Sequence, residues 1–453
     1  MFRLLSALLN AWRIPELRKK LLFTLGMIVI YEVGIFIPVP GVNGAELGRI
    51  FDQFTQATGG GFLNLMNMFT GGALSRATVF ALGVMPYISA TIIVETLLAN
   101  AIPALERLRK EGRAGYQKLH QYSRYATIAL AVINSFMYAM LLEKVIPQQF
   151  HTQIVLFPGM GFRVLTVLTM TAGMSIIMWL AEQITERGIG NGMSLLITAS
   201  IVGRIPLALR DMLVQLGPGG LEQSPMAPLV LAFMGALLIG IVLIVIFVEQ
   251  AQRRVPVQYA RRVVGQRVYG GQSTYLPLKV NTGGVLPIIF AISLLYFPVQ
   301  LATFVPALQG VTEHWFSRTS LVMNVLYALL IVFFTYFTTA ITASQFLDAA
   351  DQMKKVGAFI PGIRPGGSTV EFLDRILTRV TCVAAVYLVV IAILPDIIMA
   401  GMKIPSTVAS FFGGTSLLIV VGVTLDTMKQ IESHLLMRHY EGFFKHGRIK
   451  GRR

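Results

Sequence analysis

Residues that could carry enzyme chemistry are few, and their spacing fits no catalytic or metal-binding motif. A zinc-protease helix needs two histidines four residues apart with a glutamate beside the first, whereas the tail has Glu432, His434 and His439. The glycine-rich run 188–192 follows a membrane-type apolar run rather than a strand, so we interpret it as a helix breaker and not as a phosphate loop. The chain also lacks a Walker A sequence. We therefore predict no catalytic residue, no metal and no cofactor, and a protein that is not an enzyme.

The single cysteine, Cys382, lies inside an apolar run and has no partner for an intrachain disulfide. No histidine lies in a nearby apolar run to act as its base. We therefore expect Cys382 to be a small buried side chain rather than a nucleophile.

The composition indicates that much of the surface faces lipid. Of the 453 residues, 55% are hydrophobic and 13% are charged, against about 45–50% and about 25% in soluble domains. The apolar runs are continuous and about 20 residues long, which is the length of a helix that crosses a bilayer. The strands of a membrane barrel would instead alternate in hydrophobicity. The sequence therefore predicts an all-α polytopic membrane protein.

Ten apolar runs, separated by helix-breaking residues, are predicted to span the membrane. Pro38 and Pro40 end the first run, and Gly71 and Gly72 precede the second. The predicted helices cover residues 21–38, 76–99, 122–142, 155–181, 193–213, 228–249, 285–303, 321–346, 376–398 and 405–425.

Basic residues are distributed unequally between the two sides of the predicted membrane. Roughly 30 of the 38 Lys and Arg residues fall on the side of the N-terminal segment, the loops 250–284 and 348–374, and the tail. The positive-inside rule then places both termini in the cytoplasm. A cleaved signal peptide is the competing interpretation of residues 13–40, but the apolar run there is long and lacks small-residue cleavage chemistry.

Three connecting segments have patterns of their own. Residues 59–75 are apolar but too short to span, so we predict a re-entrant or interfacial segment that folds back into protein. Apolar residues alternate along the start of the loop 250–284, which predicts a hairpin that projects from the membrane. The loop 348–374 has a turn-rich tip and predicts a second cytoplasmic projection.

A small-solute secondary transporter is the alternative function for a chain of this kind. Ion-coupled transporters place ionisable residues in mid-membrane, because coupling needs a titratable or cation-binding group there. The acidic residues of the apolar runs fall near the predicted helix ends instead. These residues are Glu32, Glu95, Glu182, Glu249 and Asp396. The centres of the runs are nearly free of charge, which favours an apolar or gated path.

Six strings occur in a fixed order from the first predicted helix to the last. They are IPVPG at 37–41, MPYISA at 85–90, ERGIGNG at 186–192, YLPLKVN at 275–281, IPGIRPG at 360–366 and GGTSLLI at 413–419. In these strings the chain resembles the SecY family, the channel subunits of the bacterial protein-export translocase.

The resemblance implies ten transmembrane helices in two inverted, pseudo-symmetric five-helix halves around a central pore. The halves would be residues 1–213 and 214–425, followed by a basic cytoplasmic tail at 426–453. It also implies a channel in the bacterial inner membrane. Such a channel translocates unfolded secretory proteins and releases membrane-protein helices sideways through a gate between its second and seventh helices.

The resemblance also implies the residues of the pore. The plug falls at about 62–74, with the apolar side chains Phe62, Leu63, Leu65, Met66, Met68 and Phe69. The pore ring falls on Val84, Ile88, Met193, Ile197, Ile289 and Ile419. An apolar ring suits this role because it offers a passing chain no hydrogen bonds and excludes ions by dewetting when it is narrow.

The family's docking surfaces for the ribosome and for the motor ATPase SecA correspond to the loops 250–284 and 348–374. The candidate contacts are Arg261, Arg262, Arg267 and Arg364, whose guanidinium groups suit phosphates or acidic protein surfaces. The other partners that the resemblance implies are the small membrane subunits SecE and SecG, signal sequences, unfolded polypeptides and membrane lipid.

Overall fold

The architecture comes from a computed structural model of the whole chain. The structure describes residues 12, 14–57, 66–207, 210, 227–259, 262–264, 267–269, 273–302, 320–364, 366–402 and 414–446.

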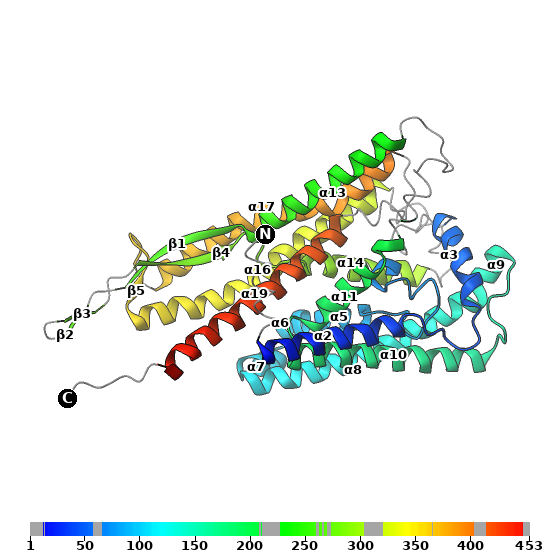
Figure 1. The fold of residues 1–453 in the computed structure, drawn as a ribbon, viewed down its shortest axis with the longest axis horizontal. Helices are drawn as coiled ribbons and strands as arrows, with labels where there is room; N and C mark the ends of the chain where they lie inside the picture. The colour runs from blue at the N-terminus through cyan, green and yellow to red at the C-terminus, as the bar shows by residue number, and fades with distance from the viewer. Residues whose placement is uncertain are drawn as a thin grey trace.

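Long helices lie side by side and dominate the fold (Figure 1). The helices of the first half are α2 (Pro15–Gly34), α3 (Gly44–Ala57), α5 (Met85–Thr91), η1 (Ile92–Leu98), α6 (Ala99–Ala101), α7 (Pro103–Lys110), α8 (Arg113–Met140), η2 (Leu141–Val145), α9 (Ile146–Phe150), α10 (Met160–Arg187) and α11 (Gly192–Gly203). Those of the second half are α13 (Ala227–Gln250), α14 (Leu286–Ala302), α16 (Leu321–Val356), α17 (Gly367–Met402) and α19 (Gly414–His446).

Two groups of helices meet along the centre of the bundle. In the first half, α8 packs against α5 and α10, and α11 packs against α10 and α2. In the second half, α16 packs against α14 and α17, and α19 packs against α13 and α17. The two groups touch where α5 meets α14 and where α11 meets α19. One buried apolar cluster draws residues from all of these helices.

Each of the ten predicted apolar runs overlaps a described helix. Within the described ranges, four helices are long and apolar enough to cross a membrane by length and composition: Arg113–Gln148, Met160–Arg187, Leu321–Ile341 and Gly367–Leu394. A fifth results if Met85–Leu98 and Pro103–Arg109, which meet at 100°, form one bent span. Gly192–Leu207, Gly235–Gln250 and Leu286–Leu295 are shorter apolar helices. The number of ten spans stays a prediction.

The second predicted helix is wrong over residues 76–84, which form turns. Helix α5 begins only at Met85, with Pro86 in its first turn, where the missing N–H has no helical partner to lose. Before it, Ala77 and Gly83 have positive φ angles of 47° and 56°. A left-handed backbone cannot continue a right-handed helix. Apolar composition alone therefore extended this helix too far towards the N-terminus.

The prediction of a buried Cys382 is wrong, because its side chain is exposed on α17. Val383, Val386 and Val390 on the same helix are 62%, 60% and 56% exposed. An apolar run in a membrane protein presents one side to lipid, so its apolar character does not imply burial within the chain.

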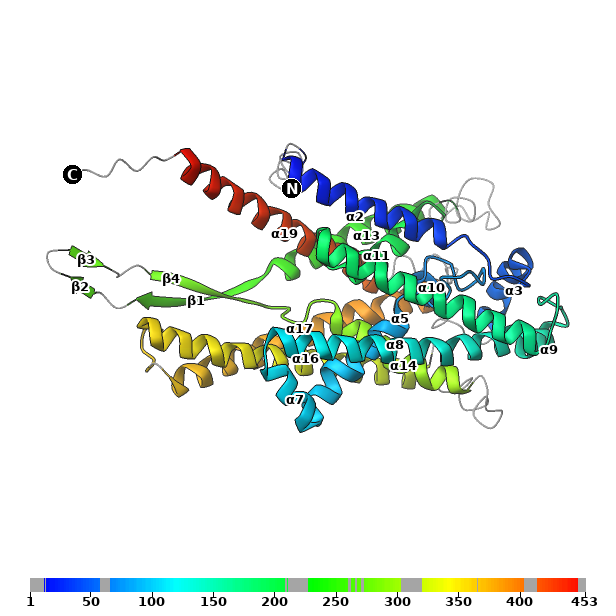
Figure 2. The ribbon, with the colours of Figure 1, turned by 90° about the horizontal axis from the view of Figure 1, so that it is seen from below.

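The predicted hairpin in the loop 250–284 is confirmed. Strand β1 (Gln252–Tyr259) pairs antiparallel with β4 (Ser273–Lys279), with Val255 opposite Leu276. Strand β5 (Ala358–Phe359) adds to the other edge of β1, so the loops 250–284 and 348–374 contribute to one sheet. The pair β2 (Arg262–Val264) and β3 (Arg267–Tyr269) lies beyond it. We call the strands β1 to β5, with the turns next to them, the arm. In Figures 1 and 2 the arm extends at the end of the molecule opposite α3 and α9.

Candidate functional site

The six predicted ring residues come together in the central apolar cluster, although they lie on four separate helical segments. Five of them belong to its buried core: Val84 is 1% exposed, Ile88 9%, Ile197 2%, Ile289 7% and Ile419 1%. Met193 is partly buried and packs against the same cluster. All six residues therefore belong to, or pack against, one buried apolar cluster, although they are up to 335 positions apart in the sequence.

Two helix starts position four of the ring residues. Val84 precedes the first turn of α5, and Ile88 N–H donates to its carbonyl oxygen at 3.1 Å, so the two side chains lie one turn apart. Asn191 caps α11 by accepting from Ser194 N–H at 3.2 Å. This cap fixes the first turn of α11 and with it Met193 and Ile197. The glycine-rich run 188–192 is thus confirmed as a helix break.

The described part of the predicted plug is buried rather than exposed. Met66, Met68 and Phe69 are 3%, 4% and 3% exposed and belong to the same apolar cluster as the ring. For this part, the prediction that the half-length segment folds back into protein is confirmed. Phe62, Leu63 and Leu65 lie outside the described residues.

A short run of hydrogen bonds holds the plug segment in its compact shape. Gly72 N–H donates to Asn67 O at 2.7 Å, and Ser75 N–H donates to the Asn67 side chain at 3.0 Å. Tyr138 of α8 donates from its hydroxyl to Leu74 O at 2.6 Å. Backbone groups in such a buried turn cannot reach water, so these partners replace it. Tyr138 is the one long-range tether in this set.

The plug segment lies directly beside the ring. Gly83 adopts a φ of +56°, and a Cβ at this position would meet Thr70 Cγ2 at 2.7 Å. Gly83 is the residue before Val84, so the chain reaches the first ring position by passing against the plug. Only a residue without a side chain allows this close approach.

Three of the four predicted docking arginines lie on the arm. Arg262 pairs with Tyr269, and Arg267 pairs with Val264, in the β2–β3 pair. Arg364 is exposed in the turn after β5, where its carbonyl oxygen accepts from Thr369 Oγ1 at 3.0 Å. A small apolar cluster that includes Val255, Val257 and Leu278 supports the sheet beneath this turn. Arg261 lies outside the described residues.

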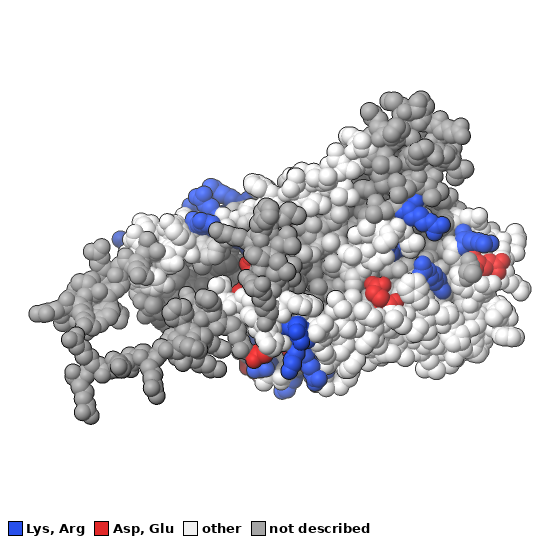
Figure 3. Space-filling model, viewed as in Figure 1, with Lys and Arg blue, Asp and Glu red and all other residues white. Residues whose placement is uncertain are grey.

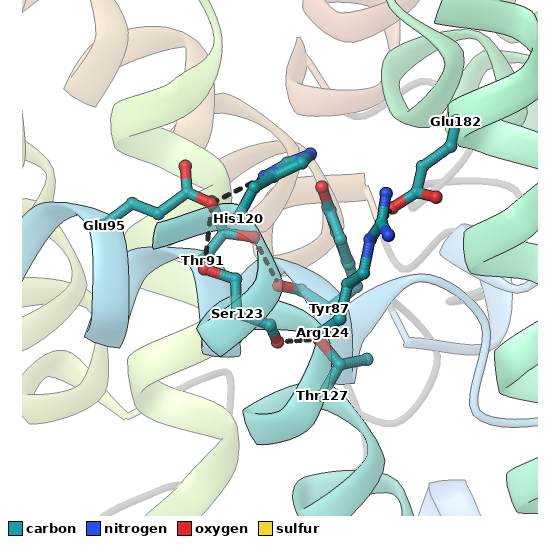
Figure 4. Close-up of polar contacts among 8 residues, drawn as sticks. All are labelled: Tyr87, Thr91, Glu95, His120, Ser123, Arg124, Thr127 and Glu182. Atoms are coloured by element: carbon teal, nitrogen blue, oxygen red, sulfur yellow. Dashed lines mark hydrogen bonds and ion pairs between the residues drawn. The ribbon is translucent and has the colours of Figure 1, made fainter. Parts of the chain in front are cut away.

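Sequence reasoning missed a polar network inside the first half (Figure 4). Glu95 on η1 contacts His120 Nδ1 at 2.8 Å and accepts from Ser123 Oγ at 2.8 Å, both on α8. Arg124 of α8 donates to Glu182 of α10 at 2.6 Å. The sequence places Glu95 and Glu182 only near predicted helix ends. The spacing of the polar residues on α8, at i, i+3 and i+4, was the signal that could have found the network.

Charged residues make up 13% of the chain. Figure 3 shows charged side chains in separate groups on one face, with uncharged residues over the helical bundle between them. Over the described ranges, no three His, Cys, Asp or Glu residues are grouped as a metal site would need. The site is therefore characterised by its apolar residues.

Comparison with known proteins assigns the chain to a family. A family model described as SecY matches residues 78–428. The chain is 45% identical to the protein translocase subunit SecY of Mycobacterium bovis, over 98% of this chain and 100% of that protein. The SecY subunit of Streptomyces coelicolor gives the same identity and coverage. That of Thermotoga maritima is 42% identical over 99% of this chain and 100% of its own length.

Solved structures agree on the fold. A protein-conducting channel is similar with a TM-score of 0.60 at 16% identity, over 92% of each chain. The channel of a canine ribosome–channel complex from the endoplasmic reticulum is similar with a TM-score of 0.53 at 15% identity, again over 92% of each chain. At these identities the likeness concerns the fold alone.

Proposed function

Because this chain belongs to the SecY family of translocase subunits, we propose that its apolar centre is the constriction of a protein-conducting channel. Unfolded secretory proteins pass through the channel, and helices of membrane proteins leave it sideways into the bilayer. The observation that carries the proposal is that the six ring residues and the described plug residues share one apolar cluster. The relatives are translocase subunits, so the small-solute transporter has no support.

The pore ring and the plug contribute to the seal in different ways. The ring residues give a narrow path without hydrogen-bonding groups, so a polypeptide is not held as it slides. The plug residues Met66, Met68 and Phe69 fill the path when no polypeptide is present, since they pack into the same cluster. Neither task needs a catalytic group or a cofactor, and the chain acts as a channel rather than as an enzyme.

The arrangement in the membrane follows from the halves and from the charge asymmetry. Residues 1–213 and 214–425 form the two halves, and 426–453 form the tail. Their ten spans lie in the bacterial inner membrane with both termini in the cytoplasm. The arm carries Arg262, Arg267 and Arg364 into the cytoplasm, where the ribosome and SecA dock. Arg261, which precedes Arg262 in the sequence, belongs to the same docking surface. SecE and SecG bind the exposed apolar faces within the bilayer.

Reconstitution tests the proposed function directly. The chain, together with SecE, SecG and SecA, is incorporated into lipid vesicles, and a secretory precursor is added with ATP. We expect the precursor to become protected from external protease only when ATP is present. If the precursor is protected from protease without ATP, or is not protected at all, the proposal is contradicted. Gradient-driven uptake of a small solute by the same vesicles would restore the transporter alternative.

Arg364→Glu is expected to slow ATP-dependent export in these vesicles by about tenfold, because it places a like charge against an acidic partner surface. The exposed position of Arg364 means that the fold tolerates the change. Export is measured as protected precursor over time, at equal amounts of inserted channel. The matched control is Arg375→Glu, the same charge reversal at a 64% exposed side chain on α17. Equal export rates for the two variants would remove the docking role of Arg364.

A further inference from the structure

One face of α8 carries a polar network in an otherwise apolar part of the fold (Figure 4). His120, Ser123, Arg124 and Thr127 follow one another at helical spacing and so share this face. The face looks towards η1 on one side and α10 on the other. Polar groups in such surroundings are costly unless they are paired. A set that is retained and paired therefore needs a structural or functional reason.

Glu95 is the centre of the contact between η1 and α8. Its Oε1 atom receives both the Ser123 hydroxyl and the His120 Nδ1 contact, each at 2.8 Å. The side chain of Glu95 is 27% exposed, so water competes only partly for this oxygen. Hydrogen bonds to a charged group are stronger than neutral ones. Two side chains of α8 thus hold one carboxylate of η1.

A second contact places His120 close to the pore ring. Its imidazole lies nearly perpendicular to the aromatic ring of Tyr87 on α5, with centroids 6.3 Å apart and planes at 84°. Tyr87 is the residue next to Ile88. His120 therefore contacts the α5–η1 segment at two places, one beside the pore ring and one two turns later.

Arg124 extends the network to α10. Its Nε donates to Glu182 at 2.6 Å, and the Glu182 side chain is 17% exposed. Helix α8 is thereby fixed to α10 by an ion pair and to η1 by the Glu95 contacts. The segment Ile92–Leu98 is a π-helix, a form that is rare and often lies at functional positions.

Helix α5 also packs against α14, where the polar contact among the described residues is a weak one. Ser293 Oγ contacts Met85 Sδ at 3.9 Å. A thioether sulfur is a weak acceptor. The same segment thus has charge-assisted bonds towards α8 and a weak polar contact towards α14. A separation of the two halves would break the α5–α14 contact, whose described polar part is the weaker of the two.

We propose that Glu95 is a positioning residue that clamps the α5–η1 segment to α8, so that α5, η1, α8 and α10 move as one unit against α14. The inference rests on the proposed channel function, in which the contact between α5 and α14, here called the seam, opens for a signal sequence. The clamp keeps Ile88 in a fixed place within the moving unit. It lets the seam open without distorting the first-half side of the ring.

Spin-label distances test the clamp in the complete channel complex. Cys382 is replaced by serine, and labels are placed on Ile93 of η1 and Ile128 of α8, whose side chains are 41% and 39% exposed. We expect a narrow η1–α8 distance distribution that a synthetic signal peptide does not change. In Glu95→Ala the distribution should broaden by about twofold or more, because the bonds to a charged group are lost. Glu95→Gln keeps an acceptor oxygen but loses the charge, so its distribution should be narrower than that of Glu95→Ala and broader than that of the unmodified protein.

Two further variants complete the experiment. Glu143→Ala breaks the bidentate pair with Arg163, at 2.7 and 3.0 Å, which joins η2 to α10 away from η1, and it should leave the distribution narrow. His120→Phe keeps an aromatic ring beside Tyr87 and removes the contact between residue 120 and Glu95, so it replaces Glu95→Ala if that variant does not fold. A distribution as narrow as in the unmodified protein in both Glu95→Ala and His120→Phe would overturn the clamp.

A label pair across the seam separates this proposal from the channel function. With labels on Ile93 and on Leu294 of α14, which is 49% exposed, the signal peptide should lengthen the distance. If the signal peptide does not change the Ile93–Leu294 distance, the proposed opening between α5 and α14 is contradicted. The clamp is then tested by the η1–α8 distances in the Glu95 variants alone. A seam that responds while the η1–α8 distance changes equally would contradict the clamp and keep the gate.

Discussion

Asparagine in place of Ile289 is expected to turn a sealed channel into one that leaks ions. Ile289 is 7% exposed and lies in the apolar cluster with Ile88 and Ile197. A narrow apolar constriction excludes ions because water leaves it, and an amide that holds water there removes this barrier. We expect ion influx into vesicles to rise by about tenfold or more. Influx is followed with an anion-quenched dye trapped in the vesicles, in the absence of precursor and SecA.

The neighbouring residue supplies a matched control. Ile288 is on the same helix, α14, and is fully buried at 0% exposure, so asparagine there carries a similar folding cost. It is not a ring position and should leave the vesicles tight. A leak of equal size in both variants would show that a general loss of packing, and not the ring, governs ion passage. Tight vesicles with Ile289→Asn would exclude Ile289 from the seal.

Patterns of short range could be predicted from the sequence because local chemistry determines them. The segment 59–75 was too apolar for water and too short for a span, and its described part is indeed buried. The alternation at Val255 and Val257 predicted the arm, since inward and outward side chains alternate along a strand. Both arguments need only neighbouring residues. They hold without knowledge of the partners in space.

Features that depend on distant partners could not be read from the residues alone. Any buried isoleucine looks the same along the chain, so the ring came only from the resemblance to a known family. The network of Glu95 and His120 joins residues on different helices, and nothing in either segment specifies the partner. The left-handed turns at Ala77 and Gly83 were missed because an apolar run hides a break that tertiary contacts impose. The prediction for Cys382 is wrong because an apolar run does not show which side of its helix faces outwards. That side depends on the helices that pack against α17.

Alanine in place of Gly173 is expected to destabilise the protein although it adds only a methyl group. Gly173 lies on α10, where its backbone passes so close to Val79 that a Cβ would collide with the Val79 carbonyl oxygen and lie 2.7 Å from Val79 Cγ1. Val79 cannot easily withdraw, because its N–H donates to Ile37 O at 2.9 Å. Overpacking of this kind costs about 1–3 kcal/mol. We expect a lower unfolding temperature in detergent, followed by intrinsic fluorescence.

The same collision should also weaken the seal, because Val79 belongs to the segment that leads to Gly83 and Val84. Displacement of α10 by the new methyl group would push this segment against the plug, where Gly83 already lies close to Thr70. The control is Gly161→Ala, also on α10, where a Cβ would have open space. Alanine is the better helix former, so the control should be neutral or slightly stabilising. If the two variants unfold at the same temperature and are equally tight to ions, close packing at Gly173 does not hold the plug segment in place.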